Sequence, residues 1–159
     1  MAAHTIKSGI SSLDKILSKG IPRNNLIIIA GEAGIAKSVM LENLAYNFLN
    51  ILKEPIIFVT LDKPAYAIER EMANFGWGLE PFVKKGLVRF VDCFSFRMES
   101  KQNVNYAEMI ANPRDIASLT TSIFQLIDKM NMNNKEQSSL ILLPNFLCLK
   151  VRRCSSMKL

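Results

Sequence analysis

A lysine and a serine, Lys37 and Ser38, close a loop of small residues that begins at Gly31. The loop follows the apolar run 26–30, which is expected to form a buried strand, and leads into a segment with helical spacing. In such a strand–loop–helix unit, the loop N–H groups and the positive end of the helix face one concavity, where a phosphate can bind. The lysine then reaches the outer phosphates and the serine hydroxyl ligates Mg²⁺. The sequence therefore predicts a nucleotide site.

The predicted loop departs at one position from the pattern G-x-x-x-x-G-K-[ST], because Ala36 stands where the second glycine is expected. If that position has a positive φ angle, alanine costs roughly 1–2 kcal/mol there, and about 1.4 kcal/mol is a tenfold loss of affinity. The alternative is a small-residue turn that only joins a strand to a helix. The residues assigned to the loop are Gly31, Glu32, Ala33, Gly34, Ile35, Ala36, Lys37 and Ser38.

Apolar runs alternate with helical patterns along the chain, which predicts an α/β fold with a mainly parallel sheet flanked by helices. The carboxyl ends of parallel strands form the edge where ligands bind, and segments 31–38 and 60–63 are both expected there. Residues 93–111 show a weak pattern and are expected to form an exposed loop. The expected strands are 26–30, 56–61, 87–92 and 139–143, and the expected helices are 37–52, 64–75, 80–85 and one that begins near residue 112.

Two helix starts have sequence signals of their own. Residues 5–17 are expected to form a short strand or turn and then a short helix capped by Ser11 or Ser12. Asn112 and Pro113 are expected to cap and open the helix that precedes the last predicted strand.

The composition predicts one domain of 159 residues, with 49% hydrophobic and 21% charged residues. No apolar run approaches the roughly 20 residues of a membrane span, and no secretory signal is visible, so a cytoplasmic location without membrane insertion is expected. The three cysteines show no C-x-x-C spacing, and His4 is the single histidine, which disfavours a zinc site.

The basic charge is concentrated at the C-terminal end. The net charge of the chain is +6, and four basic residues lie in segment 150–159 without an acidic residue. We treat residues 1–149 as the domain and residues 150–159 as a basic tail. The tail is either an arm that binds nucleic acid or a frayed terminus.

Five segments of the chain, which follow one another in the order typical of the family, resemble the KaiC-like and RadA-like ATPases of the RecA superfamily. The resemblance implies a RecA-like P-loop NTPase core that binds ATP and Mg²⁺, with Gly31, Gly34, Lys37 and Ser38 at the phosphates and the metal ion. It also implies assembly into a homo-oligomer, because members form rings or filaments with ATP at subunit interfaces. The matching segments are 9–17, 20–22, 58–62, 75–77 and 112–115.

Three departures from the family pattern bear on catalysis. Asp62 takes the place of the catalytic carboxylate, and Lys63 replaces a second acid, so Asp62 is either catalytic or a solvated acid paired with Lys63. Pro144 and Asn145 follow the strand at 139–143, where the family has an acid that steadies Mg²⁺. The chain then ends at Leu159, and a core without its C-terminal strands is expected.

Three hypotheses for function follow. The first is a KaiC-like ATP-binding protein with weak or absent hydrolysis. The second is a non-catalytic interaction module that assembles with itself or with an intact paralogue, because a shortened sheet leaves an apolar edge. The third is an ATPase of DNA repair or recombination whose basic tail contacts phosphates.

Overall fold

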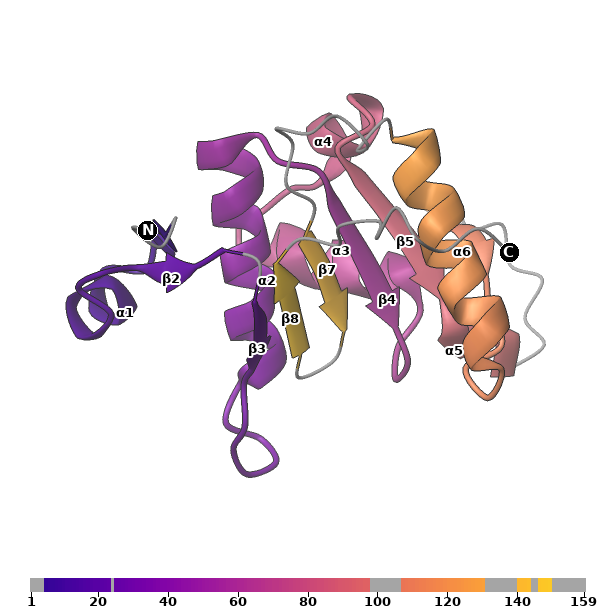
Figure 1. Cartoon of the computed structure of the whole chain (residues 1–159), viewed down its shortest axis with the longest axis horizontal. Coiled ribbons are helices and arrows are strands. Elements are labelled where there is room, and N and C mark those ends of the chain that lie inside the picture. Colours follow the sequence, from indigo (N-terminus) through magenta and orange to yellow (C-terminus); the bar gives the residue numbers. More distant parts are fainter. Residues whose placement is uncertain (1–4, 24, 98–106, 131–139, 144–145, 150–159) are drawn as a thin grey trace.

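The structure, a computed structural model, describes residues 5–23, 25–97, 107–130, 140–143 and 146–149 (Figure 1). The predicted basic tail, residues 150–159, and the pair Pro144 and Asn145 lie outside the described residues. The strands are β1 (Thr5–Ile6), β2 (Ile21–Pro22), β3 (Leu26–Ile28), β4 (Ile56–Thr60), β5 (Val88–Asp92), β6 (Ala107–Ile110), β7 (Leu140–Leu143) and β8 (Phe146–Leu149). The helices are α1 (Ser11–Ile16), α2 (Lys37–Asn47), η1 (Phe48–Leu52), α3 (Ala65–Asn74), α4 (Glu80–Lys84), α5 (Cys93–Arg97) and α6 (Ile116–Lys129).

The main sheet has the strand order β3-β8-β7-β4-β5-β6, and β1 pairs with β2 in a separate small sheet. Strands β7, β4, β5 and β6 pair in parallel, which confirms the predicted α/β class. Strand β8 is antiparallel to both β7 and β3. Because β8 is antiparallel to both of its neighbours, β3 and β7 run in the same direction, and β4 is parallel to β7. The carboxyl ends of β3 and β4 therefore lie at the same edge of the sheet, the lower edge in Figure 1.

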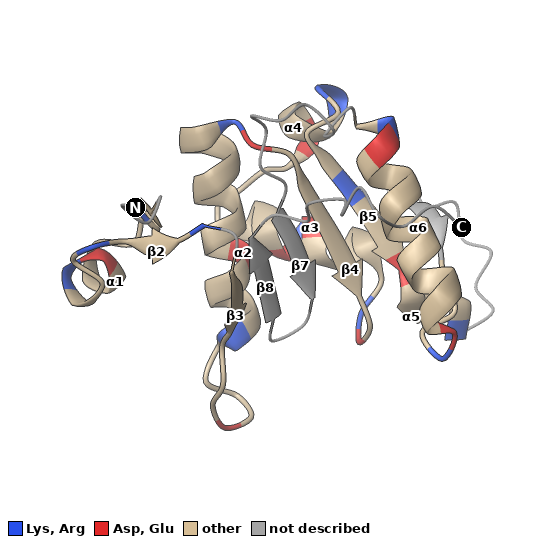
Figure 2. Cartoon of the chain, in the orientation of Figure 1, with Lys and Arg blue, Asp and Glu red and all other residues tan. Residues whose placement is uncertain are grey.

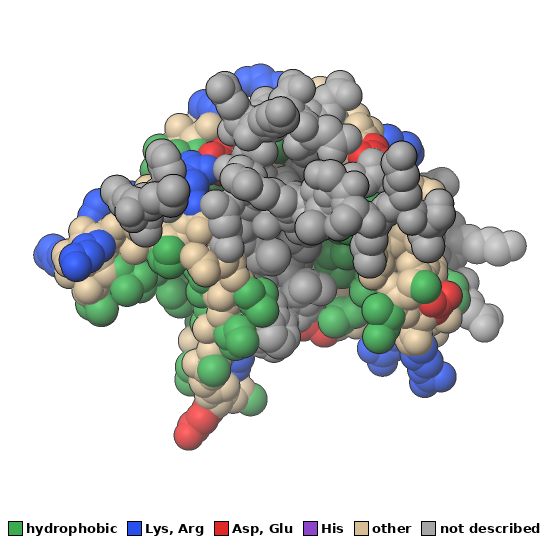
Figure 3. All heavy atoms as spheres, viewed as in Figure 1, with side chains coloured by type: hydrophobic (Ala, Val, Ile, Leu, Met, Phe, Trp, Pro, Cys, Tyr) green, Lys and Arg blue, Asp and Glu red, His purple; other side chains and the backbone are tan. Residues whose placement is uncertain are grey.

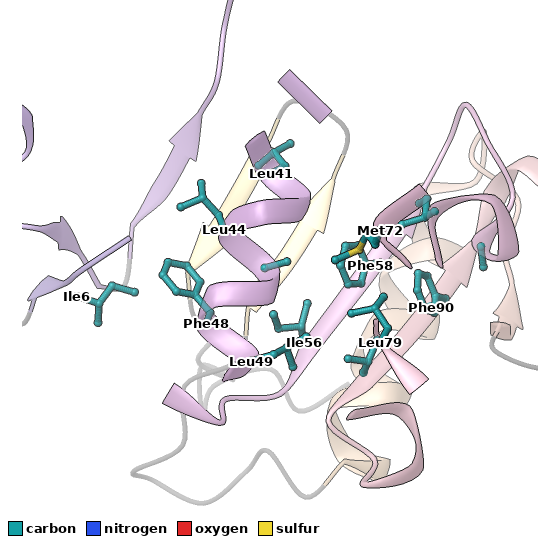
Figure 4. Packing of buried hydrophobic residues seen from close by; sticks show 14 of the residues in the cluster. Ile6, Leu41, Leu44, Phe48, Leu49, Ile56, Phe58, Met72, Leu79 and Phe90 are labelled. Atoms are coloured by element: carbon teal, nitrogen blue, oxygen red, sulfur yellow. The ribbon is translucent and has the colours of Figure 1, made fainter. Parts of the chain in front are cut away.

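Alternate residues of β4 enter two separate cores on opposite faces of the sheet. Ile56 and Phe58 pack with helices α2, η1, α3 and α4, whereas Ile57 and Val59 pack with α5 and α6. Figure 4 shows the first of these cores, in which side chains of α2 and η1 meet β4. The burial of both faces explains the continuous apolar run of this strand. Helix α2 is thereby fixed against the sheet just behind the predicted phosphate loop.

Strand β3 corrects the prediction of a buried strand. Leu26 and Ile28 are each 59% exposed, while Ile27 and Ile29 pack against the core on the α2 face. The reason is position: β3 is the last strand of the sheet, and α6 lies over β4 and β5 on the opposite face. Figure 3 shows hydrophobic side chains along β3 and the loop that follows it.

The expectation about the middle of the chain is wrong, and the end of the chain holds a strand that was not predicted. The predicted loop 93–111 contains α5 and β6, and the segment 146–149 forms β8. Periodicity is weak in these short elements because tertiary contacts define them: β6 pairs with β5, and β8 inserts between β3 and β7. Asp92, at the end of β5, also fixes the start of α5, because its carboxylate accepts hydrogen bonds from Ser95.

Neither helix has the cap that was predicted for it. Helix α6 begins at Ile116, and the Asp115 carboxylate accepts hydrogen bonds from the N–H groups of Ala117 and Ser118, each at 3.1 Å. Helix α1 has Ile10 before it and no side-chain cap. An aspartate outcompetes Asn112 here because its carboxylate lies where it can bond two N–H groups of the first turn.

Candidate nucleotide-binding site

The predicted phosphate loop has the backbone needed to turn from β3 into α2. Gly34 has φ +83° and Ala36 has φ +61°, so both lie in the left-handed region. Helix α2 starts directly afterwards at Lys37 and runs for 11 residues. The first turn of a helix leaves N–H groups without intrahelical acceptors, and they carry partial positive charge. The loop therefore presents a surface that suits an anion.

Two contacts hold this loop in shape. The Lys37 ammonium donates hydrogen bonds to the carbonyl oxygens of Gly31, at 3.0 Å, and Glu32, at 2.7 Å. At Gly31 a Cβ atom would lie 2.2 Å from Cδ1 of Ile35, so a side chain there would displace Ile35. The lysine thus lies back across its own loop, and the residues from Gly31 to Ala36 are exposed.

Replacing Ala36 with glycine is expected to relieve backbone strain that the folded loop already carries. The left-handed backbone at this position costs alanine roughly 1–2 kcal/mol, whereas glycine adopts it freely. Greater freedom of the unfolded glycine offsets part of this gain. We expect Ala36→Gly to raise the midpoint of thermal unfolding slightly. The Kd for ATP–Mg²⁺, measured by calorimetric titration, should stay nearly unchanged, because the strain is a cost of folding the loop and not of binding a ligand to it.

The control for this variant is Ala33→Gly, because Ala33 is in the same exposed loop and is absent from the residues with positive φ. It should leave stability unchanged or lower it. An Ala36→Gly chain less stable than Ala33→Gly would contradict the strain argument.

Lys63, in the turn after β4, joins two helices. Its ammonium donates to Glu42 of α2 at 3.0 Å and to Glu71 of α3. Burial lowers the pKa of Lys63, but these hydrogen bonds to Glu71 and Glu42 outweigh that effect and hold the pKa above its ordinary value. The turn that carries Asp62 is therefore tied to the helix that begins at the phosphate loop.

This arrangement corrects the expected ion pair between Asp62 and Lys63. Lys63 uses Glu42 and Glu71 instead, and Asp62 is exposed. Neither glutamate was predicted from the sequence as a partner of Lys63. Glu42 had one usable signal, since it lies four residues after Ser38 and thus on the same side of the helix.

Glu42 is a buried acid. Its side chain is 5% exposed, and its Oε2 atom has no hydrogen-bond partner among the described residues. Burial raises the pKa of Glu42 above its ordinary value of 4.5, although the hydrogen bond from Lys63 acts in the opposite direction. Between 4.5 and the raised value the folded chain holds a proton that the unfolded chain has lost, so the stability of the wild type falls as pH rises through this window.

A Glu42→Gln chain does not titrate at this position. We expect its stability relative to wild type to increase as pH is raised from 4.5 to neutral, by about 1 kcal/mol for each unit of pKa difference. Urea denaturation at a series of pH values measures this difference. Glu80→Gln is the control. The hydrogen bond from Lys84 lowers the pKa of Glu80, so the stability of Glu80→Gln relative to wild type should decrease as pH rises. Parallel curves for Glu42→Gln and wild type would refute the assignment.

Asp92, at the end of β5, is fully buried and organises the same edge of the sheet. Its carboxylate accepts bonds from the Ala65 N–H at 3.1 Å, the Ser95 N–H at 2.7 Å, the Ser95 hydroxyl at 2.8 Å and the Thr60 hydroxyl at 3.4 Å. One side chain thus fixes the starts of α3 and α5 and the end of β4. This role of Asp92 could have been predicted from the sequence, because an aspartate at the end of a strand, three residues before Ser95, is a suitable helix cap.

The described chain also holds a buried thiol, Cys93. Burial, with a smaller effect of the neighbouring Asp92, raises the pKa of the buried Cys93 thiol to about 11, so this thiol stays protonated near neutral pH. Among the described residues, no His, Cys, Asp and Glu side chains gather in a group of three that could hold a metal ion. No helix in the described part of the chain is long and apolar enough to cross a membrane.

Comparisons with known proteins agree with this architecture. UPF0273 protein PH0284 of Pyrococcus horikoshii is 31% identical over 127 residues, which are 79% of this chain and 50% of that protein. A UPF0273 protein of Thermotoga maritima is 36% identical over 90 residues, 57% of this chain and 37% of the relative. The crystal structure of KaiC-like protein PH0186 from Pyrococcus horikoshii superimposes with a TM-score of 0.61 and 26% identity, covering 81% of this chain and 50% of that one.

This chain spans about half the length of the relatives that match it over 127 residues. The family model described as "ATPase: KaiC" matches residues 6–137, which include the phosphate loop, the turn after β4 and helix α6. The chain therefore belongs to the KaiC-like ATPases of the RecA superfamily of P-loop NTPases.

Proposed function

We propose that the loop Gly31–Ser38 binds ATP with Mg²⁺ and that the chain hydrolyses ATP slowly or not at all. The observation that carries the proposal is the left-handed backbone of Ala36 directly before the exposed start of α2. The residues fit phosphate because the loop is exposed and the Lys37 ammonium lies within it, 3.0 Å from the Gly31 carbonyl oxygen. Ser38 would ligate Mg²⁺, which would neutralise phosphate charge.

Slow hydrolysis follows from the surroundings of the proposed catalytic acid. Asp62 is exposed, and the adjacent Lys63 is engaged by two glutamates. Phosphoryl transfer needs a group that holds the attacking water in line, and an exposed aspartate without a described partner is poorly oriented for that task. The sequence also places Pro144 where the family has its magnesium acid.

Calorimetric titration with ATP, first with Mg²⁺ and then with EDTA, tests the proposal together with a phosphate-release assay. Saturable heat that weakens in EDTA, with little phosphate release, is the expected result. A chain that gives no saturable heat at millimolar ATP does not bind nucleotide here. Rapid release of phosphate would refute the second half of the proposal.

A second candidate function is assembly with another copy or with an intact paralogue through β3. Leu26 and Ile28 expose apolar surface on an edge strand, and burying such side chains stabilises an interface by roughly 1.5–3 kcal/mol each. We expect Ile28→Lys to weaken self-association at least tenfold in sedimentation experiments. Ile116→Lys is the control, because Ile116 is 76% exposed on α6. Equal effects of both variants would contradict a β3 interface.

A further inference from the structure

A pocket lies at the far end of the same sheet edge. It has a volume of about 310 Å³ and is lined by Phe96, Arg97, Asn112, Pro113 and Arg114, which we call the arginine pocket. Its walls directly follow β5 and β6, whereas the phosphate loop follows β3 at the other end of the strand order. A ligand of the phosphate loop therefore does not account for this pocket.

The pocket combines cationic and aromatic groups. Arg97 and Arg114 are exposed, and within the described part of the chain neither has an ion pair. The adjacent acid, Asp115, uses its carboxylate to cap α6. Figure 2 shows basic residues at the lower end of α5 and in the loop that leads into α6. Two like charges in one pocket favour a bound anion.

Phe96 adds a flat apolar surface beside these charges. It is 45% exposed, so part of the ring is open to a ligand. Asn112 is held in place because its side-chain oxygen accepts a hydrogen bond from the Arg114 N–H at 3.0 Å. Nucleotides present a phosphate to arginine and a planar base to an aromatic ring.

We propose that the arginine pocket binds a nucleotide unit, with its phosphate between Arg97 and Arg114 and its base against Phe96. The cavity volume lies at the lower end of the range for small-ligand sites, about 300–1,000 Å³, which fits one nucleotide. Arg97 also donates a hydrogen bond to the Leu61 carbonyl at 3.2 Å, next to Asp62. The pocket is thus joined to the turn after β4, but its binding does not depend on the proposed ATP site.

The test measures binding of AMP that carries a fluorescent N-methylanthraniloyl group, by anisotropy, in the Lys37→Ala chain. This background removes the lysine of the phosphate loop, so failure of the ATP proposal does not affect the result. We expect saturable binding that weakens at least tenfold in Arg97→Gln/Arg114→Gln and several-fold in Phe96→Leu. The matched control, Arg70→Gln/Lys85→Gln, removes two exposed positive charges elsewhere and should change Kd less than twofold.

Competition identifies the source of the nucleotide. If only unlabelled AMP displaces the fluorescent AMP, the pocket binds a free nucleotide. If a ten-residue oligothymidine displaces it more strongly than AMP, the pocket binds a nucleotide of a single-stranded nucleic acid. Either result supports the proposal. Inorganic phosphate or phosphotyrosine that competes as well as AMP would overturn the nucleotide assignment. Equal losses in the pocket variant and the charge control would overturn the site. Arg114→Gln alone, at an exposed side chain, gives the same test if Arg97 affects folding.

Discussion

Replacing Lys37 with alanine is expected to weaken ATP–Mg²⁺ binding by a factor of roughly 10 to 150. A hydrogen bond to a charged group contributes about 1.5–3 kcal/mol, and about 1.4 kcal/mol is tenfold in affinity. In the present conformation the ammonium donates to the carbonyls of Gly31 and Glu32, so it is already within the loop that would receive the phosphates. Calorimetric titration of both chains with ATP–Mg²⁺ measures the change.

The control is Lys19→Ala, which removes the same charge from an exposed position outside the loop. It should bind ATP like the wild type. Circular dichroism checks that Lys37→Ala still folds, because the variant also loses two hydrogen bonds within the loop. Indistinguishable binding heats for Lys37→Ala and wild type would exclude nucleotide binding by this loop.

Replacing Asp92 with alanine is expected to lower the free energy of unfolding by about 3 kcal/mol or more. Each buried donor left without an acceptor costs roughly 1–3 kcal/mol, and the Asp92 carboxylate serves the N–H groups of Ala65 and Ser95 as well as two hydroxyls. Because these donors belong to β4, α3 and α5, their loss loosens the whole carboxyl edge of the sheet. Urea denaturation followed by far-ultraviolet circular dichroism measures the loss.

Asp115→Ala provides a matched comparison, since Asp115 also caps a helix with two hydrogen bonds but is exposed. Loss of an exposed cap costs about 1 kcal/mol. The loss of free energy of unfolding in Asp92→Asn should lie between the losses in Asp92→Ala and Asp115→Ala, because the asparagine amide keeps one acceptor oxygen. Equal destabilisation by Asp92→Ala and Asp115→Ala would show that burial of Asp92 contributes nothing.

Local patterns in the sequence were enough to predict the α/β class and most of its elements. The apolar run around Phe58 forms β4, and the spacing after Lys37 forms α2 and η1. These elements are long enough for their periodicity to stand out, and both faces of β4 are buried. The strain expected at Ala36 was also readable, because the residue pattern of a phosphate loop specifies where the backbone must be left-handed.

Short elements and side-chain partners could not be predicted in this way. Segment 146–149 is a short apolar run whose periodicity does not distinguish a strand from a buried helix segment, yet it pairs with β3 and β7. The exposure of Leu26 and Ile28 likewise depends on which strand lies at the edge. Pairing order is a long-range property, so a run of apolar residues is the same in a central strand and an edge strand.

The phosphate loop shows the division most clearly. The residues that can form this loop are recognisable from local pattern alone, since Gly31, Lys37 and Ser38 follow an apolar run and precede a helix. The binding of Lys63 to Glu42 and Glu71, which leaves Asp62 exposed, is visible only in the folded chain. Backbone conformation follows from neighbouring residues, whereas the partner of a charge depends on which helices the packed sheet brings within hydrogen-bond distance.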